Sequence, residues 1–239
     1  MTCRMLDWDS SFFGRRIARL EPLRVNASQV EDALAWCQER QIDCLYLLAD
    51  PTDRETITAA ERAGFRNVDI RITYERVLGG ARLERPDRIR AVRPDEVAVL
   101  EAIAADCHTD TRFYFDEHFS STTASQLYRT WIRQSCHRQD GQVLVLEAEA
   151  GGGPVGYVAC EQRAGEPGQI GLIGLAAAAR GRGGGTALIQ AALAWFADRG
   201  AELVTVVTQG RNVDAQRLYQ KAGFLTQKVE IWYHRWFDR

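Results

Sequence analysis

The sequence predicts an α/β (α+β) fold in which helices cover a central, mostly antiparallel mixed sheet. Segments with the period-2 apolar pattern of strands alternate with segments of helical periodicity in the second part of the chain. A glycine-rich turn at residues 180–185 joins one strand directly to one helix. A weaker copy of the same order of elements occurs near the start of the chain.

The composition is that of a globular protein with a substantial core. The chain has 239 residues, of which 46% are hydrophobic and 26% are charged. Its longest uncharged apolar run, residues 170–179, is far shorter than the ~20 residues that a membrane-spanning helix needs. The first residues lack the continuous apolar stretch of a secretory signal. We therefore expect a cytoplasmic protein without a membrane partner.

Charge and cysteine usage argue against two further classes of protein. The formal net charge of −2 disfavours nucleic acid as a partner. The six cysteines form no Cys-x-x-Cys pair, and Cys107-His108 and Cys136-His137 lack the spacing of zinc ligands. We expect reduced thiols and no metal site.

An internal repeat predicts the fold of the first part of the chain, residues 1–80. A shift of 159 positions aligns Ala-Gly-Phe at 63–65 with Ala-Gly-Phe at 222–224 without a gap. The same shift aligns a predicted helix at 30–38 and a predicted strand at 45–49 with a helix and a strand of the second part. We therefore interpret the first part as a truncated copy of the second.

Residues 81–87 are predicted to be a linker, because a glycine pair precedes them and Pro86 interrupts both periodicities. They separate a first domain, residues 1–80, from a second domain, residues 88–239. In the second domain the apolar patterns predict strands at 89–92, 143–149, 155–162, 169–175, 203–208 and 228–237, and helices at 95–107, 123–136, 212–222 and from the glycine-rich turn to about 199.

The run Arg-Gly-Arg-Gly-Gly-Gly at residues 180–185 carries the clearest chemical signal. It precedes a helix whose Leu188, Ala192, Trp195 and Phe196 form one apolar face. Glycines let several backbone N–H groups point into one concavity, and the helix start adds unpaired amides with a partial positive charge. Such a nest suits a pyrophosphate. The Gly-Lys-Ser/Thr of a P-loop and the spacing of a dinucleotide fingerprint are both missing.

With these residues the sequence resembles the GCN5-related N-acetyltransferase (GNAT) family. The family pattern Arg/Gln-x-x-Gly-x-Gly/Ala between a strand and a helix is matched by Arg180, Gly183 and Gly185. The resemblance covers residues 88–239 and implies the GNAT fold, with acetyl-coenzyme A as cosubstrate. A second family pattern, Asn-x-x-Ala-x-x-x-Tyr-x-x-x-Gly-Phe, is matched by Asn212, Ala215, Tyr219, Gly223 and Phe224.

The resemblance implies that the loop amides bind the pyrophosphate of the coenzyme and that the preceding strand binds its pantetheine arm. A strand edge offers regularly spaced partners to such an amide-bearing ligand. Capping of its own helix would also explain the residue type of Asn212. The implied cofactor-binding residues are Ile173, Leu175, Arg180, Gly181, Arg182, Gly183, Gly184, Gly185, Thr186 and Asn212.

Tyr219 is the implied general acid. A departing thiolate is a base with a pKa of ~8.5 and a phenol has a pKa of ~10, so Tyr219 can hydrogen-bond to the thiolate or protonate it. The first candidate for the general base is Glu161, at the end of a predicted strand. Asp116, Glu117 and His118 are weaker candidates.

The first copy has lost both of these features. Its equivalent of the glycine-rich loop, residues 21–26, contains no glycine and includes a proline that lacks an N–H group. Tyr219 aligns with Ala60. We therefore expect residues 1–80 to be non-catalytic and to serve packing or substrate shaping.

The acceptor site is predicted between the first two helices of the second domain, where members of the family build it. Arg112, Phe113 and Tyr114 there combine a cation that pairs with phosphate and rings that stack on a base or cover a sugar. Taken over the whole chain, the sequence resembles the nucleotide-amino-sugar N-acetyltransferases of the family, and the segments that carry this resemblance are residues 8–14, Arg112-Phe113 and Tyr128-x-x-Trp131-Ile132. The resemblance implies a small-molecule acceptor, a dTDP-4-amino sugar for surface polysaccharide, acetylated by direct transfer in a ternary complex.

Two alternatives stay open at this point. A peptide or protein N-terminal acetyltransferase would have an acidic, open groove in place of Arg112 and its aromatic neighbours. A regulatory module that binds acetyl-coenzyme A without turnover would not need Tyr219 and Asn212. A homodimer is the default expectation for such enzymes.

Overall fold

The computed structural model describes residues 3–80, 83 and 85–237. Its strands form one ten-stranded sheet in the order β1-β2-β3-β10-β4-β9-β8-β7-β6-β5. The pairs β2/β3 and β8/β9 are parallel and the other neighbouring pairs are antiparallel, which confirms the predicted mixed, mostly antiparallel sheet. The strands are β1 (Cys3–Met5), β2 (Ile17–Leu20), β3 (Cys44–Ala49), β4 (Arg66–Val77), β5 (Ile89–Ala91), β6 (Gly141–Glu147), β7 (Pro154–Glu161), β8 (Gly168–Leu175), β9 (Leu203–Gln209) and β10 (Leu225–Trp236).

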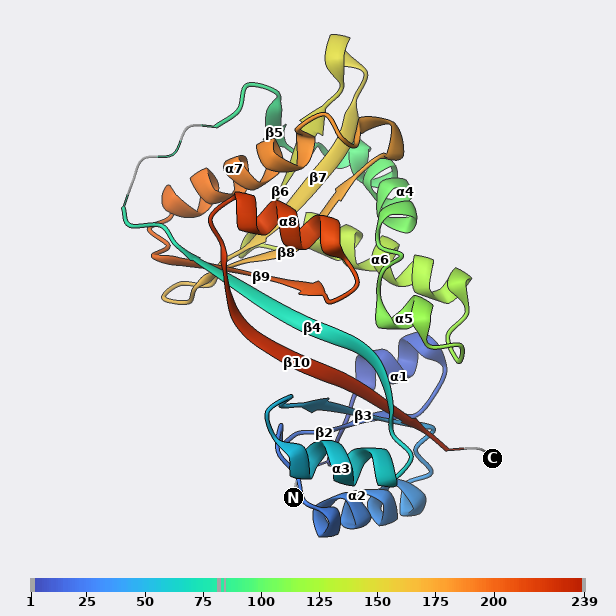
Figure 1. Ribbon diagram of the computed structural model, residues 1–239. Helices are drawn as coiled ribbons and strands as arrows, with labels where there is room; N and C mark the ends of the chain where they lie inside the picture. Colours follow the sequence, from blue (N-terminus) through green and yellow to red (C-terminus); the bar gives the residue numbers. More distant parts are fainter. Residues whose placement is uncertain (1–2, 81–82, 84, 238–239) are drawn as a thin grey trace.

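Helices cover both faces of this sheet (Figure 1). The predicted helix at 95–107 begins as a 3₁₀ turn, η1 (Pro94–Glu96), because Pro94 fixes the backbone where the chain leaves β5. Within the described ranges no helix is long and apolar enough to cross a membrane. The α-helices are α1 (Asp7–Phe13), α2 (Ala27–Glu39), α3 (Arg54–Arg62), α4 (Val97–Cys107), α5 (Arg112–Phe115), α6 (Ser121–Cys136), α7 (Gly184–Ala197) and α8 (Val213–Lys221).

Alternate residues of one strand belong to two separate cores. In β6, Leu144 and Leu146 pack in the cluster that contains α7, whereas Val143 and Val145 pack in the cluster that contains α4 and α6. Successive side chains of a strand point to opposite faces, so α7 lies on one face of the sheet and α4 and α6 lie on the other. A third cluster joins α2 and α3 to the strands of the N-terminal half.

Strands β4 and β10 are equivalent elements of the internal repeat, and they pair with each other. These long antiparallel strands run side by side and join the two halves of the molecule (Figure 1). Arg71 of β4 lies opposite Glu230 of β10, and the 159-residue shift aligns these two positions with each other. Their side chains form an ion pair. The two strands are therefore related by an approximate twofold axis that passes between Arg71 and Glu230.

The two halves exchange their last strands. β4 of the first half pairs with β9 of the second, and β10 of the second half pairs with β3 of the first. The registers agree with the repeat, since the pair Ile72 and Thr208 is shifted by 159 positions from the pair Ile231 and Ala49. The predicted linker at 81–87 follows β4, and its residues 81, 82 and 84 lie outside the described residues. Through the exchange, the first half contributes a strand to the middle of the sheet.

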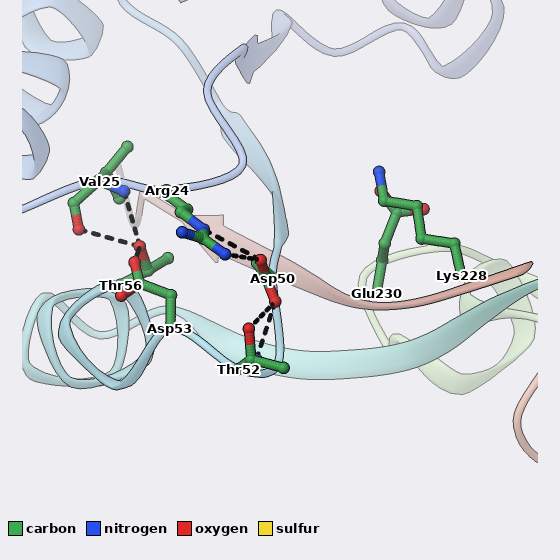
Figure 2. Close-up of polar contacts among 8 residues, drawn as sticks. All are labelled: Arg24, Val25, Asp50, Thr52, Asp53, Thr56, Lys228 and Glu230. Carbon is green, nitrogen blue, oxygen red and sulfur yellow. Dashed lines mark hydrogen bonds and ion pairs between the residues drawn. The ribbon is translucent and has the colours of Figure 1, made fainter.

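The loop of the first half that aligns with the glycine-rich run is bonded to two side chains from outside the loop, Asp50 and Thr56. The Val25 N–H group donates to Thr56 Oγ1 at 2.6 Å, and the same hydroxyl lies 2.5 Å from Asp53 Oδ2. Arg24 forms an ion pair with Asp50 at 2.8 Å, as Figure 2 shows. Asn26 caps α2. The Val25 amide and the α2 start thus already have partners, and the Asp53 carboxylate lies close to them.

Candidate active site

Strands β8 and β9 separate and leave a cavity between them. Their parallel pairing is confined to residues 168–170 of β8 and 204–206 of β9. Beyond Ile170, β8 stays paired with β7 as far as Leu175, so its edge toward β9 is open. A cavity of about 250 Å³ lies at this opening and is lined by β8, β9, α5 and α8. The open edge supplies the backbone partners that an extended amide-bearing ligand needs.

The glycine-rich run lies just beyond the end of β8 and begins α7. Gly181 and Gly183 have φ values of 74° and 80°, a left-handed conformation that glycine adopts without strain. The first helical bond runs from Ala187 N–H to Gly183 O, so the amides of 184–186 have no acceptor within the helix. In the part of the chain that the structure describes, no hydrogen bond uses the amides of 181–183 either. These free N–H groups fit a pyrophosphate.

Tyr219 lines the cavity from α8. Its side chain is buried, and its ring packs against Tyr74 of β4 at 5.9 Å and Phe224 at 6.0 Å between centroids. Burial raises the pKa of the Tyr219 phenol, which keeps the group protonated at neutral pH. The hydroxyl has no hydrogen-bond partner among the described residues. A protonated, unpartnered phenol in a cavity is suited to donating a proton.

Asn212 also lines the cavity, at the start of α8. Its side-chain oxygen accepts the Ala215 N–H group at 3.1 Å and so caps the helix. Ile173 of β8 lies in the cavity wall, and Arg180 Nε donates to the Leu175 carbonyl at 3.2 Å. The structure therefore brings the predicted cofactor-binding residues to one strand end and the two helix starts beside it.

Asp69, which sequence reasoning missed, lines the same cavity from β4. Its side chain is only 3% exposed, and Oδ1 accepts the Ile70 N–H group at 2.9 Å and lies 4.0 Å from Arg211 Nη2. Burial raises the pKa of the Asp69 carboxyl group, although Arg211 opposes this effect. The sequence carries no signal that singles out Asp69, because β4 alternates apolar and charged residues and an acid at position 69 fits that pattern.

The cavity receives side chains from both faces of the sheet. Ile72 and Tyr74 of β4 pack in the core on the α7 face, where Tyr74 contacts Tyr219. By alternation, Asp69 and Arg71 point to the opposite face. Because Tyr219 and Asp69 both line the cavity, it passes through the sheet at the strand gap. A donor and an acceptor can therefore reach each other from opposite faces.

The other predicted base candidates have partners elsewhere. Glu161, at the end of β7, lies 3.5 Å from Arg138 Nη1 and is not among the residues that line the cavity. Asp116 accepts hydrogen bonds from His118, His234 and the Trp236 indole. Burial opposes ionisation of Asp116, but these three bonds outweigh it and lower its pKa. Glu117 is exposed beside this group.

His108 lines the cavity but has an occupied ring nitrogen. Its Nε2 lies 2.7 Å from the Tyr157 hydroxyl, and its ring stacks on Tyr128. Burial, assisted by the charge of Arg180, lowers the pKa of His108 to about 4, so the imidazole is neutral at pH 7. Among the described residues, Asp69 is the carboxylate that lines the cavity, and its ion-pair partner, Arg211, lies 4.0 Å away.

Two of the three predicted acceptor residues lie in the cavity wall. Arg112 and Phe113 line the cavity, and the Arg112 guanidinium carbon lies 4.2 Å from the Phe113 ring centroid and 4.4 Å from that of Trp232. Tyr114 lies on the same short helix, but its hydroxyl points to the Ala105 carbonyl at 3.5 Å. Trp232, a residue of β10 that sequence reasoning missed, completes this aromatic wall.

The parted strands, the free amides and the buried phenol fit an enzyme of the acyl-transferring class. The chain belongs to the acetyltransferase (GNAT) family, whose model matches residues 100–224, and it is an enzyme of that class. It is similar to dTDP-fucosamine acetyltransferase of Escherichia coli O6:H1, with 25% identity over 235 residues that cover 96% of each protein.

Two further proteins share part of the sequence or the fold. The spore coat polysaccharide biosynthesis protein SpsD of Bacillus subtilis is 25% identical over 143 residues, which cover 60% of this chain and 48% of SpsD. The crystal structure of a GCN5-related N-acetyltransferase from Sphaerobacter thermophilus matches with a TM-score of 0.67 and 19% identity, over 98% of this chain and 76% of that one. This structural likeness confirms the fold.

Proposed function

We propose that this acetyltransferase transfers the acetyl group of acetyl-coenzyme A to the amine of a nucleotide-linked amino sugar, of the dTDP-4-amino-sugar type, by direct transfer in a ternary complex. The observation that carries the proposal is the cavity through the sheet, with Tyr219 on one side and Asp69 and Arg112 on the other. The name of the Escherichia coli relative supports this class of acceptor. The proposal includes a cytoplasmic location, a homodimer and a role in surface polysaccharide synthesis.

The residues at the end of β8 fit the coenzyme. The free amides of 181–186 would bind the pyrophosphate, and the open edge of β8 at Ile173 and Leu175 would bind the pantetheine arm. Acetyl-coenzyme A supplies an acyl group activated as a thioester. Gly184 lies so close to Leu146 that an added Cβ would come within 2.8 Å of its side chain, so this glycine seats α7 against the sheet.

Tyr219 and Asp69 divide the proton transfers between them. Asp69 accepts a proton from the acceptor ammonium group, which frees the nitrogen lone pair for attack on the thioester carbon. Tyr219 donates its phenolic proton to the sulfur as the carbon–sulfur bond breaks. The acetylated amine loses its second proton to solvent, Tyr219 takes up a proton from solvent, and Asp69 releases its proton to solvent. Asp69 takes the role that the sequence suggested for Glu161, because the carboxylate of Glu161 is paired with Arg138 outside the cavity.

Asp69→Asn tests the base. At pH 7 we expect kcat/KM to fall by about 10²-fold or more, since the variant must bind the rare neutral form of the amine. The loss should shrink as the pH rises toward the pKa of the amine, because the deprotonated amine needs no base. Rates of coenzyme A release between pH 6 and 10 measure this. A loss that is constant over the whole range would contradict the role of Asp69.

The melting temperature separates this effect from misfolding. The folded state raises the pKa of Asp69, so the ionised carboxylate destabilises the fold at pH values above that pKa. The raised pKa of Asp69 therefore predicts that the Asp69→Asn variant has a melting temperature at pH 7 that is equal to or higher than that of the native enzyme. A Glu161→Gln variant is the matched control, and we expect its pH profile to follow that of the native enzyme.

We propose further that residues 1–80 form a non-catalytic domain, joined by the linker 81–87 to a catalytic domain of residues 88–239. The bonded amide of Val25 and the alignment of Ala60 with Tyr219 support this proposal. Calorimetry should therefore measure one acetyl-coenzyme A bound per chain. Two sites per chain, or one site that survives Gly183→Asp, would contradict it.

The acceptor is tested by coenzyme A release with a panel of amines. The panel contains dTDP- and UDP-linked 4-amino sugars, the same sugars without the nucleotide, and basic N-terminal peptides. We expect turnover with the nucleotide-linked amines and kcat/KM at least ten times lower with the free sugars. Preferred turnover of peptides would support an N-terminal acetyltransferase instead. Coenzyme binding without turnover of any amine in the panel would support the regulatory module.

A further inference from the structure

Two arginines from different halves of the chain lie against one tryptophan at the acceptor side. The ring of Trp232 in β10 has the guanidinium carbon of Arg112 at 4.4 Å from its centroid and that of Arg19, from β2, at 5.3 Å. Phe113 and Tyr46 also contact the guanidinium of Arg112, at 4.2 and 5.6 Å. Trp232 and Arg112 line the cavity, and Arg19 extends this surface away from the strand gap.

Neither guanidinium has an ion-pair partner among the described residues. Among the residues that the structure describes, no ion pair or hydrogen bond uses the side chain of Arg19 or Arg112, and the Nε atom of each is buried without an acceptor. Glu21 and Glu230, the acids that act on Arg19 through space, are paired with Arg4 at 2.7 Å and with Arg71. Asp9 and Asp69 act on Arg112 through space without forming an ion pair with it.

Other arginines of the same sheet do find partners. Arg71 is paired with Glu230, and Arg90 forms ion pairs with Glu96 and Glu147 at 2.6 Å each. Half-buried cations without a counter-charge cost free energy unless a ligand compensates them. Both side chains lie against Trp232, and Arg112 also lies against Phe113, which lowers the entropy that such a ligand must overcome. The unpaired state of two neighbouring guanidinium groups therefore points to an anion with two charged centres.

We propose that Arg19 and Arg112, which both lie against Trp232, bind the diphosphate of the nucleotide-linked acceptor. This inference rests on the proposed function and makes the first half of the chain part of the acceptor site. Each guanidinium presents a planar fork that binds the oxygens of one phosphate. The repeat aligns Arg19 with Ala178, so the cation belongs to the first copy alone.

The strand register places this diphosphate site at a suitable distance from the reacting amine. Trp232 lies directly opposite Asp69 across the β10/β4 pair, one strand spacing of about 4.8 Å away. A pyranose ring that carries its amine toward Asp69 spans a comparable distance. Its phosphates then lie beyond Trp232, where β10 is followed by β3 and β2 and where Arg19 is located. Across the sheet from β4 toward β2, the register thus places the base Asp69 first, then the sugar and then the phosphates.

The coenzyme also carries a diphosphate, so the experiment has to separate two sources of the same chemistry. Calorimetry of thymidine diphosphate and of coenzyme A is carried out on the native enzyme, Arg19→Gln, Arg112→Lys and the control Arg24→Gln. Arg24 lies in the same half but is paired with Asp50. Arg112→Lys keeps the charge and removes the fork, which provides a second variant if Arg19→Gln fails to fold.

We expect the Kd of thymidine diphosphate to rise by about 10- to 100-fold in both site variants, because each loses charge-assisted hydrogen bonds. The Kd of coenzyme A should stay within about twofold of the native value in both, and the control should change neither constant. An unchanged Kd for thymidine diphosphate in both site variants would overturn the inference. A loss of affinity that is confined to coenzyme A would also overturn the inference.

Failure of the diphosphate site can be distinguished from failure of the proposed function. If thymidine diphosphate binding depends on Arg19 but no nucleotide-linked amine is acetylated, the anion site stands and the proposed acceptor is wrong. If nucleotide-linked amines are acetylated and Arg19→Gln leaves their KM unchanged, the proposed function stands and the diphosphate site is wrong. A KM that rises for nucleotide-linked amines but not for the free sugars supports both.

Discussion

Replacement of Tyr219 by phenylalanine should lower kcat by about 10²-fold and leave the Kd of acetyl-coenzyme A nearly unchanged. The phenol is protonated because burial raises its pKa, and its hydroxyl has no partner in the described structure. Removal of one oxygen leaves the packing of the ring against Tyr74 and Phe224 intact. The measurement is steady-state coenzyme A release with a saturating acceptor, together with calorimetry of the coenzyme.

Tyr74→Phe is the matched control for this variant. Tyr74 is buried in the same core at 5.9 Å from Tyr219, but it does not line the cavity. We expect its kcat to stay within about twofold of the native value. Equal losses in the two variants would indicate that a buried phenol matters for packing rather than for proton donation. Undiminished turnover in Tyr219→Phe would remove Tyr219 from the mechanism.

Gly183→Asp should abolish tight binding of the coenzyme. Gly183 has a φ of 80°, and nothing lies within 4 Å of the position that a Cβ atom would take. The new side chain would therefore enter the open space in front of the free amides. Aspartate tolerates the left-handed conformation better than most residues, so its charge beside the pyrophosphate is the main change. We expect the Kd of coenzyme A to rise by at least about 10²-fold in calorimetry.

Gly183→Asn separates charge from shape at the same position. Asparagine has the size of aspartate and also tolerates positive φ, but it carries no charge. We expect it to retain most of the coenzyme affinity that Gly183→Asp loses. If both variants bind equally weakly, the loop fails for steric reasons. If both bind as well as the native enzyme, the loop at 181–185 does not hold the pyrophosphate.

Local signals in the sequence account for the proposed coenzyme side of the site. The glycine-rich run follows a strand and begins a helix, and each of these features depends on residues within a few positions of one another. Tyr219 could be located for the same reason, since its helix starts at a capping residue directly after β9. The mixed sheet followed from apolar alternation in β6 to β9, where each strand contacts its neighbour in sequence.

The acceptor side could not be predicted in the same way, because it depends on the exchange of strands between the halves. Asp69 reaches the cavity only because β4 lies between β10 and β9. Arg19 and Trp232 are more than 200 positions apart in the sequence and meet through β3. No local pattern encodes such a contact. The prediction for Glu161 used its position at a strand end and could not include Arg138, whose Nη1 lies 3.5 Å from one oxygen of the Glu161 carboxylate.

The internal repeat illustrates how one unit can diverge into two roles. In the second half, Gly184 and its neighbours leave amides free at the start of α7. In the first half, the aligned Val25 amide is bonded to Thr56, and an arginine occupies position 19 where the second half has Ala178. The first half has thus lost the features that would bind a coenzyme, and we propose that it has gained those that bind an acceptor.

The most direct test of the central claim is a crystal structure of the enzyme with coenzyme A. We predict that the pantetheine arm lies between β8 and β9, that the pyrophosphate accepts hydrogen bonds from the amides of 181–185, and that the sulfur points to the Tyr219 hydroxyl. Coenzyme bound elsewhere, with the strand gap closed to it and the loop amides free, would contradict the proposed site and the acetyl transfer derived from it.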